Sequence, residues 1–261
     1  MNQEAHSPLF AFLTTPLLGV GCLLLSTGAF ANGPNGESVT YEVDDESFQG
    51  YYASPEEEAK GTVLIIHDWD GLTEYEQLRA EMLAEQGYAA FAVDLYGKDN
   101  RPESMDARKA EMEKLYEDRE RMRQLTLAGL EQAREKGVPD NTVIMGYCFG
   151  GAVVLEMARS ADAEGIHGYT SFHGSLDTPE GQEWPDEIAP ILIAHGGADE
   201  SVTMDDVATL AEELEAADAT YEIQVYSGAP HAFTVYDGDR YQERADKKSW
   251  SAFLDFLDKT L

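Results

Sequence analysis

The sequence predicts an α/β fold with a mostly parallel central sheet and helices on both of its faces. Runs of β-branched and aliphatic residues, which suit strands buried on both faces, alternate with segments of helical spacing. The chain has 261 residues, of which 43% are hydrophobic, and this is enough for one large packed domain. Alternation of this kind builds right-handed strand–helix–strand units, which place helices on both faces of the sheet.

The predicted elements follow one another in regular order after a polar lead-in. Two short strands come first, at 39–43 and 48–53, and a charged loop covers 55–60. Buried strands are then predicted at 62–66, 88–93, 142–145, 166–172, 191–194 and 221–226. Helices are predicted at 74–86, in one long charged region from about 104 to 136, and at 149–159, 204–217 and 240–257.

An uncharged segment near the N-terminus predicts export. Residues 9–30 contain no charged side chain, and Ala29-Phe30-Ala31 has the small-residue pattern of a signal-peptide cleavage site. We expect a signal peptide at 1–31, cleaved after Ala31, and a periplasmic or secreted protein. Residues 32–261 would then form a single domain without stable membrane association. The alternative is an uncleaved membrane anchor, because about 20 apolar residues can span a bilayer.

The predicted mature chain is strongly acidic. Residues 1–31 hold one acid, Glu4, and no Lys or Arg, so the 50 acids and 18 bases of the whole sequence become 49 and 18, a net charge of −31. Such a field repels nucleic acid and anionic lipid, and neither is expected as a partner. Because brine screens self-repulsion, we expect a protein from a high-salt environment; an ordinary acidic exported protein is the alternative.

Removal of the signal peptide would leave a single cysteine. Cys22 lies in the signal segment, so Cys148 would have no partner for an internal disulfide. An unpaired cysteine in an exported protein suggests a reactive thiol, and a buried, inert cysteine is the alternative.

Cys148 lies in a pattern that resembles a nucleophile elbow. The segment Gly146-Tyr147-Cys148-Phe149-Gly150-Gly151 follows a predicted strand and opens a predicted helix, matching G-x-S-x-G with cysteine in place of serine. The turn is strained, and larger residues at the glycine positions would collide with neighbouring backbone. The helix N-terminus is expected to favour a thiolate, and the amide of Phe149 to donate to an oxyanion.

An acid and a histidine follow this cysteine in the chain order nucleophile, acid, histidine that α/β-hydrolases use. Asp199 lies in the loop after the predicted strand at 191–194, and His231 in the loop after the last predicted strand. We expect His231 to take the thiol proton and Asp199 to orient the imidazole. Asp94 is the rival acid and His195 the rival base, and Asp199 could instead only cap the helix that follows it.

Other loops at the carboxyl edge of the sheet hold further candidates. The loop after the strand at 62–66 is expected to supply a second oxyanion donor, the amide of Trp69. His173, after the strand at 166–172, is a candidate for the rim of the pocket. Arg101 is a candidate for binding an anion.

Together these residues resemble the dienelactone hydrolase family over roughly residues 45–258. The resemblance rests on four motifs: His67-Asp68-Trp69-Asp70-Gly71-Leu72, Asp94-Leu95-Tyr96-Gly97, Gly146-Tyr147-Cys148-Phe149-Gly150-Gly151 and Pro230-His231-Ala232-Phe233. It implies a cysteine-nucleophile enzyme of the α/β-hydrolase fold without a large lid, needing no metal or organic cofactor. It also implies a small-molecule ester or lactone substrate, and we expect a monomer.

Two departures from the family pattern concern substrate binding. The resemblance implies a Glu that engages the resting thiol, and this sequence has the shorter Asp68 at that position. It also implies two arginines that hold the substrate carboxylate; Lys98 stands at one of these positions and Val235 at the other. We expect Asp68 and Lys98 to contact substrate, but the dienelactone itself is placed in doubt by Val235.

The function predicted from the sequence is hydrolysis of a small ester or lactone through a covalent intermediate on Cys148. A general carboxylesterase or thioesterase is the alternative within this class. A redox-active thiol protein would need a resolving cysteine, and the predicted mature chain has none. A non-catalytic binding protein on the same fold is the third alternative, and an intact triad argues against it.

Overall fold

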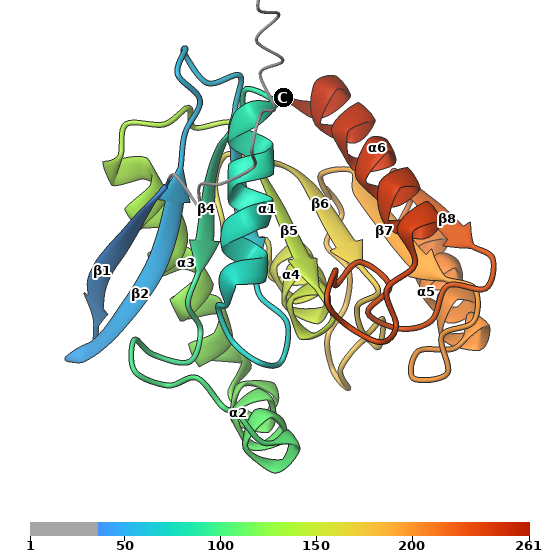
Figure 1. Cartoon of the computed structure of the whole chain (residues 1–261). Helices are drawn as coiled ribbons and strands as arrows, with labels where there is room; N and C mark the ends of the chain where they lie inside the picture. Colours follow the sequence, from blue (N-terminus) through green and yellow to red (C-terminus); the bar gives the residue numbers. More distant parts are fainter. Residues whose placement is uncertain (1–35) are drawn as a thin grey trace, which may run out of the picture. The chain divides into compact units, whose positions relative to one another are not determined.

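The structure is a computed structural model that describes residues 36–261, and the predicted signal peptide at 1–31 lies outside this range. The described chain forms one eight-stranded sheet with the strand order β1-β2-β4-β3-β5-β6-β7-β8 (Figure 1). Pairings of β2 with β1 and β4 are antiparallel, and all others are parallel. The strands are Glu37–Val43 (β1), Glu46–Ala53 (β2), Thr62–Ile66 (β3), Ala89–Val93 (β4), Thr142–Tyr147 (β5), Ile166–Phe172 (β6), Ile191–Gly196 (β7) and Tyr221–Tyr226 (β8).

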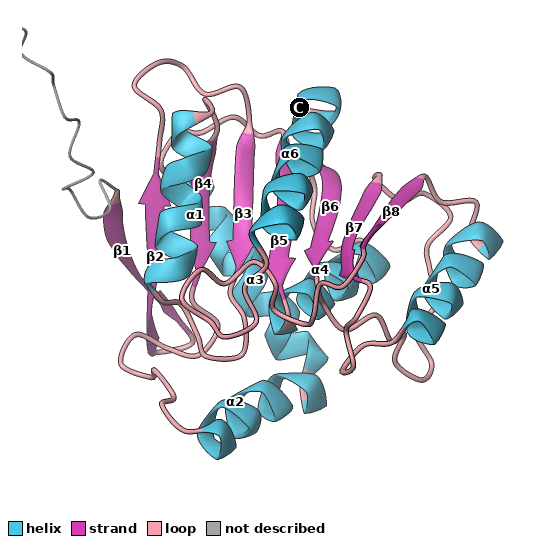
Figure 2. Ribbon diagram, turned by 45° about the vertical axis from the view of Figure 1, so that its right-hand side comes forward, coloured by secondary structure: helices cyan, strands magenta, loops and turns pink. Residues whose placement is uncertain are grey.

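Helices cover both faces of this sheet. One face packs against α1 (Glu74–Glu85) and α6 (Glu243–Thr260), which lie side by side in front of the strands (Figure 2). The other face packs against α3 (Arg119–Glu135), α4 (Phe149–Ser160) and α5 (Met204–Ala216), with α2 (Met105–Glu117) below the sheet. This is the predicted α/β-hydrolase architecture. Within residues 36–261, no helix combines the length and apolar character that a membrane span requires.

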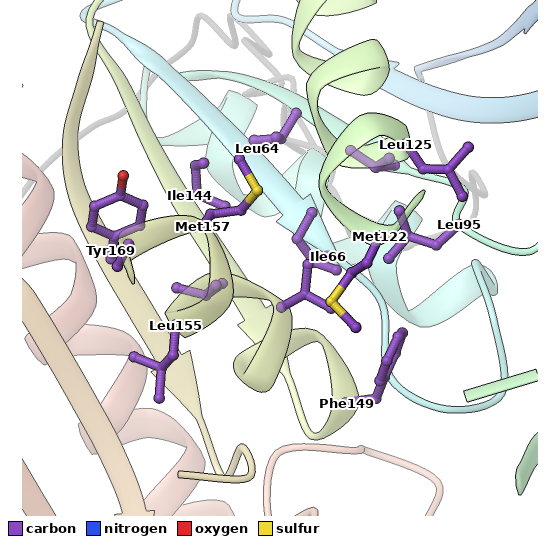
Figure 3. Close-up of a cluster of buried hydrophobic side chains, with 14 of the residues drawn as sticks. Leu64, Ile66, Leu95, Met122, Leu125, Ile144, Phe149, Leu155, Met157 and Tyr169 are labelled. Atoms are coloured by element: carbon purple, nitrogen blue, oxygen red, sulfur yellow. The ribbon is translucent and has the colours of Figure 1, made fainter. Parts of the chain in front are cut away.

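Each face of the sheet has its own hydrophobic core. Leu64 and Ile66 of β3 point toward α3 and α4 (Figure 3), while Val63 and Ile65 point toward α1 and α6. All four side chains are fully buried, and each such burial contributes about 1.5–3 kcal/mol. The two cores hold the central strands rigidly, so the loops at their carboxyl ends start from fixed positions.

The prediction of one long helical region from about 104 to 136 is wrong, because the structure has two helices there. The region is interrupted at Asp118, whose backbone (φ −120°, ψ 76°) is not helical. The Asp118 side chain accepts a hydrogen bond from the N–H of Arg121 at 2.9 Å and so caps α3. Both helices carry charges on most of their exposed surface, which hides the boundary from an analysis of periodicity.

Candidate functional site

Cys148 lies at the turn between β5 and α4. Its backbone has φ 51° and ψ −112°, a region that residues other than glycine rarely occupy. Its N–H donates to the carbonyl of Phe172 at 3.0 Å, which ties the turn to β6. The next side chain, Phe149, is buried in the core below the turn (Figure 3). The strand, turn and helix of the predicted nucleophile elbow are therefore present.

The elbow has no room for side chains at two of its glycines. A Cβ added at Gly146 would lie 2.3 Å from the carbonyl oxygen of Gly150. A Cβ added at Gly150 would lie 2.3 Å from the carbonyl oxygen of Ile66, at the end of the neighbouring strand. Both contacts are with backbone that cannot move independently of the sheet. Glycine is therefore required at each position for α4 to start so close to β3.

The imidazole of His231 lies between Cys148 and Asp199. Its Nε2 is 3.1 Å from the Cys148 sulfur, and its Nδ1 is 2.8 Å from Asp199 Oδ2. The other carboxylate oxygen of Asp199 accepts the N–H groups of Ser201 and Val202, at 2.8 and 3.0 Å. Burial raises the pKa of Asp199, but the hydrogen bonds from His231 and from these amides outweigh it and leave the pKa below its usual value. Such an ionised acid can orient the imidazole and stabilise its charged form.

Asp199 is not the cap of the following helix. The N-cap of α5 is Thr203, whose side chain accepts a hydrogen bond from the N–H of Asp206. Asp199 therefore contacts the turn before the helix and the imidazole of His231, and the alternative interpretation as a simple cap is wrong.

The surroundings of the Cys148 sulfur oppose its ionisation. Burial raises the pKa of the thiol to about 12, and the carboxylate of Asp68 contributes to this rise. The backbone N–H groups of Phe149 and Trp69 act in the opposite direction, as hydrogen bonds to the sulfur. The amide at the helix N-terminus acts in the expected direction, but burial and a nearby carboxylate outweigh the two amides. A thiol of this kind needs a base before it can attack.

The rival acid and base have other partners. Asp94 accepts hydrogen bonds from the N–H groups of Tyr96 and Gly97, both at 3.1 Å, and forms an ion pair with Arg101 at 3.3 Å. This pairing also occupies Arg101, the predicted candidate for binding an anion. His195 is buried at the end of β7, where burial lowers its pKa and neither ring nitrogen has a hydrogen-bond partner among residues 36–261. The structure brings neither rival into contact with the sulfur.

The two predicted substrate-binding residues lie in different places. Asp68 is buried beside the sulfur, and its Oδ1 accepts the N–H of Asp70 at 3.0 Å. It lines a hollow of about 430 Å³, and Val235 lies on the wall of the same hollow. Lys98 is exposed on the turn after β4, where its N–H donates to the carbonyl of Ser47, and it does not line the hollow.

Three carboxylates lie close together beside this hollow, and two of them, Asp68 and Asp70, line it. Asp68, Asp70 and Glu76 each have an oxygen within 4.8 Å of the others, close enough to share a metal ion. Burial, followed by interaction with Asp70, raises the pKa of Asp68 well above its usual value. Burial raises the pKa of Glu76 to about 7. Turn and cap contacts explain why two of these three carboxylates lie where they do. Asp68 accepts a hydrogen bond from the N–H of Asp70, and Glu76 accepts one from the N–H of Thr73.

A polar network behind His231 was not predicted from the sequence. His173 is fully buried and does not rim the pocket; its Nε2 lies 2.8 Å from Thr234 Oγ1 and its ring packs against that of His231. Thr234 also accepts hydrogen bonds from the hydroxyl of Tyr75 and, through its carbonyl, from Arg79 at 3.0 Å. The sequence does hold one signal for the burial of Arg79, namely its position in the helix. Arg79 is four residues from both Tyr75 and Leu83, and so lies on the packed face of α1.

Known proteins resemble this chain over most of its length. A Salmonella typhimurium protein named "Putative carboxymethylenebutenolidase" is 28% identical over 84% of this chain and 85% of its own length. A Bradyrhizobium protein named "Probable 2-oxo-3-(5-oxofuran-2-ylidene)propanoate lactonase" is 25% identical over 84% of this chain and 92% of its own. The solved structure of m3DLH is 26% identical, covers 88% of this chain and 100% of its own, and has a TM-score of 0.79. The model of the dienelactone hydrolase family matches residues 48–261, and the chain is therefore a hydrolase that belongs to this family.

Proposed function

We propose that this protein hydrolyses a small ester or lactone through a thioester formed on Cys148. The observation that carries the proposal is the line of contacts from the Cys148 sulfur through His231 to Asp199, at 3.1 and 2.8 Å. The base lies within hydrogen-bonding distance of both the nucleophile and the orienting acid, which is the arrangement that acyl transfer requires.

In the acylation step, His231 Nε2 takes the thiol proton as the sulfur attacks the ester carbonyl. The S–C bond forms, and the resulting oxyanion accepts hydrogen bonds from the N–H groups of Phe149 and Trp69. Collapse of this intermediate breaks the C–O bond, and the imidazolium returns its proton to the departing alkoxide. Because burial raises the pKa of the thiol to about 12, transfer to His231 must accompany the attack.

In the deacylation step, water replaces the alcohol. His231 takes a proton from water as the hydroxide attacks the thioester, and the S–C bond breaks to release the acid. The sulfur regains a proton from the imidazolium, so the enzyme returns to its starting state. Asp199 stays ionised in both steps and stabilises the imidazolium each time it forms.

A general carboxylesterase or thioesterase is a second candidate. The lining of the hollow beside Asp68 favours it over an enzyme that opens lactones carrying a carboxylate. The names of the Salmonella and Bradyrhizobium relatives describe lactones that carry a carboxyl group. Here Val235 lines the hollow, and the cation of Lys98 does not. An aliphatic side chain cannot bind a carboxylate.

The proposal is tested with p-nitrophenyl esters, thioesters and lactones, assayed in high salt with the wild type, Cys148→Ala and Cys148→Ser. We expect turnover by the wild type and none by Cys148→Ala. A thioester on the Cys148 peptide should be trapped by acid quench of the wild type during reaction with an activated ester, detected as the added acyl mass, and should be absent from His231→Ala. His195→Gln is the matched histidine control and should keep its activity. Unchanged turnover in Cys148→Ala would overturn the proposal.

A further inference from the structure

The hollow beside Asp68 is lined by acids. Asp68, Asp70, Glu74 and Asp237 contribute carboxylates to its wall, and no Lys or Arg is found among its lining residues. The remaining wall includes the apolar side chain of Val235 and two tyrosines. A pocket of this composition differs from one built for an anion, because a bound carboxylate would meet like charges and no guanidinium or ammonium group.

The hollow adjoins the nucleophile. Asp68 and Asp70 are the side chains whose charges act most strongly on the Cys148 thiol, and both are negative. The backbone N–H of Trp69, between them, lowers the pKa of the same thiol. On the other wall, Val235 follows His231 by four residues in the same loop. The hollow therefore lies between the loop that supplies an oxyanion donor and the loop that supplies the base.

Two of the acids are free to act on a ligand. Glu74 and Asp237 are exposed, and neither forms an ion pair within residues 36–261. Asp70 is partly offset by Arg108 at 3.8 Å. The cation behind the hollow, Arg79, is 1% exposed and already paired with Asp246. The negative charge of Glu74 and Asp237 is therefore not cancelled by any neighbouring side chain.

We propose that this hollow binds the cationic group of a positively charged ester and disfavours esters that carry a carboxylate. This inference rests on the proposed function and names its substrate class. The tyrosines of the hollow, Tyr75 and Tyr236, support it because aromatic rings attract organic cations. Both rings also pack against the Arg79 guanidinium, at 5.2 and 4.6 Å, and Asp246 offsets the charge of that guanidinium.

A bound cation would also assist the chemistry. Its charge would offset Asp68 and Asp70, the two carboxylates that hold the Cys148 proton in place. The thiolate would then form more easily while a cationic substrate is present. Binding and activation would depend on the same charges, so the preference for cations should appear in kcat as well as in KM.

The test compares three p-nitrophenyl esters of matched size: a trimethylammonio-butyrate, its uncharged tert-butyl analogue and a hemiglutarate. We expect kcat/KM to fall from the cationic to the neutral to the anionic ester, with about a tenfold difference between the extremes at low salt. The pocket variant Glu74→Gln/Asp237→Asn should reduce this difference. The matched control Glu131→Gln/Glu135→Gln changes two exposed acids near the end of α3, outside the hollow, and has the same net charge.

The control separates the hollow from the charge of the whole molecule. If the pocket variant and the control change the ratio equally, or if the hemiglutarate is the preferred ester, the inference is overturned while the proposed function stands. If none of the three esters is hydrolysed, the proposed function fails, and the inference about its substrate fails with it.

A second measurement does not depend on turnover. Cationic and anionic methanethiosulfonates of similar size react with thiols, and mass analysis of the Cys148 peptide follows each reaction. We expect the cationic reagent to modify Cys148 about tenfold faster relative to its reaction with a free thiol, and the pocket variant to narrow the gap more than the control does. Equal relative rates for the two reagents would contradict the inference even in an enzyme that hydrolyses every ester.

Discussion

Arg79 of α1 and Asp246 of α6 form a buried ion pair behind the loop that carries His231. Arg79 Nη2 lies 2.5 Å from Asp246 Oδ1, and the two side chains are 1% and 7% exposed. The same guanidinium nitrogen donates to the carbonyl of Thr234. Four aromatic rings surround the guanidinium, those of Tyr75, Tyr147, Tyr236 and Trp250. The pair therefore joins two helices to the loop of the proposed base.

Removing one member of this pair should destabilise the protein strongly. Asp246→Ala leaves the Arg79 charge buried without its partner, and we expect a loss of about 3–5 kcal/mol in the free energy of unfolding. Denaturant titration in high salt measures it. Glu243→Ala is the matched control, since its pair with Lys247 at 2.5 Å is exposed, and its loss should be far smaller. Similar losses in the two variants would show that the buried pair contributes no more to the free energy of unfolding than the exposed pair.

Replacement of Glu76 by glutamine should stabilise the protein above neutral pH. Burial raises the pKa of Glu76 from 4.5 to about 7, so the folded state binds more protons than the unfolded state between these values. Stability is therefore lost as the pH rises through this window, by up to about 3 kcal/mol. Glu76→Gln removes the ionisation while keeping an oxygen for the cap at Thr73. Its advantage should be small at about pH 5 and large at about pH 8, measured by denaturant titration; a constant difference would contradict the shifted pKa.

The Asp199→Asn variant should lose activity and change its acid stability. Without the orienting carboxylate, kcat should fall by about three to four orders of magnitude, as it does in serine triads that lose their acid. The pKa of Asp199 is lowered in the folded state, so its contribution to stability is present above the unfolded value near 4 and is lost as the pH falls through the folded value. Unfolding free energies measured from about pH 6 to 3 should therefore decline less in Asp199→Asn than in the wild type. Parallel declines would contradict the lowered pKa.

Substitution of Asp68 should make the thiol more reactive. The Asp68 carboxylate contributes to the raised pKa of Cys148, after burial, so Asp68→Asn should lower that pKa and increase the thiolate fraction at neutral pH. Alkylation of Cys148 by iodoacetamide, followed by mass analysis, should be faster in Asp68→Asn than in the wild type. Asp94→Asn is the control, because that acid is buried in another loop and paired with Arg101. Slower alkylation of Asp68→Asn would show that this carboxylate supports the thiolate.

Salt should stabilise the protein. The whole sequence carries a net charge of −32, and we expect Tm to rise between about 0.1 and 2 M salt as the Debye length falls from about 10 Å to below 3 Å. Differential scanning calorimetry in potassium chloride and in an equivalent concentration of sucrose separates screening from general exclusion effects. A Tm that does not respond to the salt would exclude the prediction of a protein adapted to brine.

The centre of the sheet was predictable because strands β3, β4, β5 and β7 are largely apolar and fully buried. Strands β6 and β8 have the predicted bounds, 166–172 and 221–226. The break at Asp118 was not predictable from periodicity, since the helices on either side of it are both highly charged. Local patterns identify the buried centre of this fold more reliably than the turns on its surface.

The order of the proposed triad was also predictable, because each member follows a strand in a loop at the carboxyl edge. The contacts among Cys148, His231 and Asp199 are those expected. The state of the thiol was not predictable, because its pKa depends on how deeply the sulfur is buried and on how near Asp68 lies. The burial of Arg79 was not predictable either, because it depends on partners from α6 and from a distant loop.

The glycines of the elbow determine what substitution could do at the centre of the site. Gly146 packs against the backbone of Gly150, and Gly150 against that of Ile66 and His67, so a methyl group at either would push a strand and the helix apart. Position 148 itself has no such restriction on the identity of its reacting atom, because its side chain points away from these contacts toward His231. Sulfur could be exchanged for oxygen here with little change to the frame. The reacting atom at position 148 can therefore change in evolution, whereas Gly146 and Gly150 cannot be replaced without disturbing the turn.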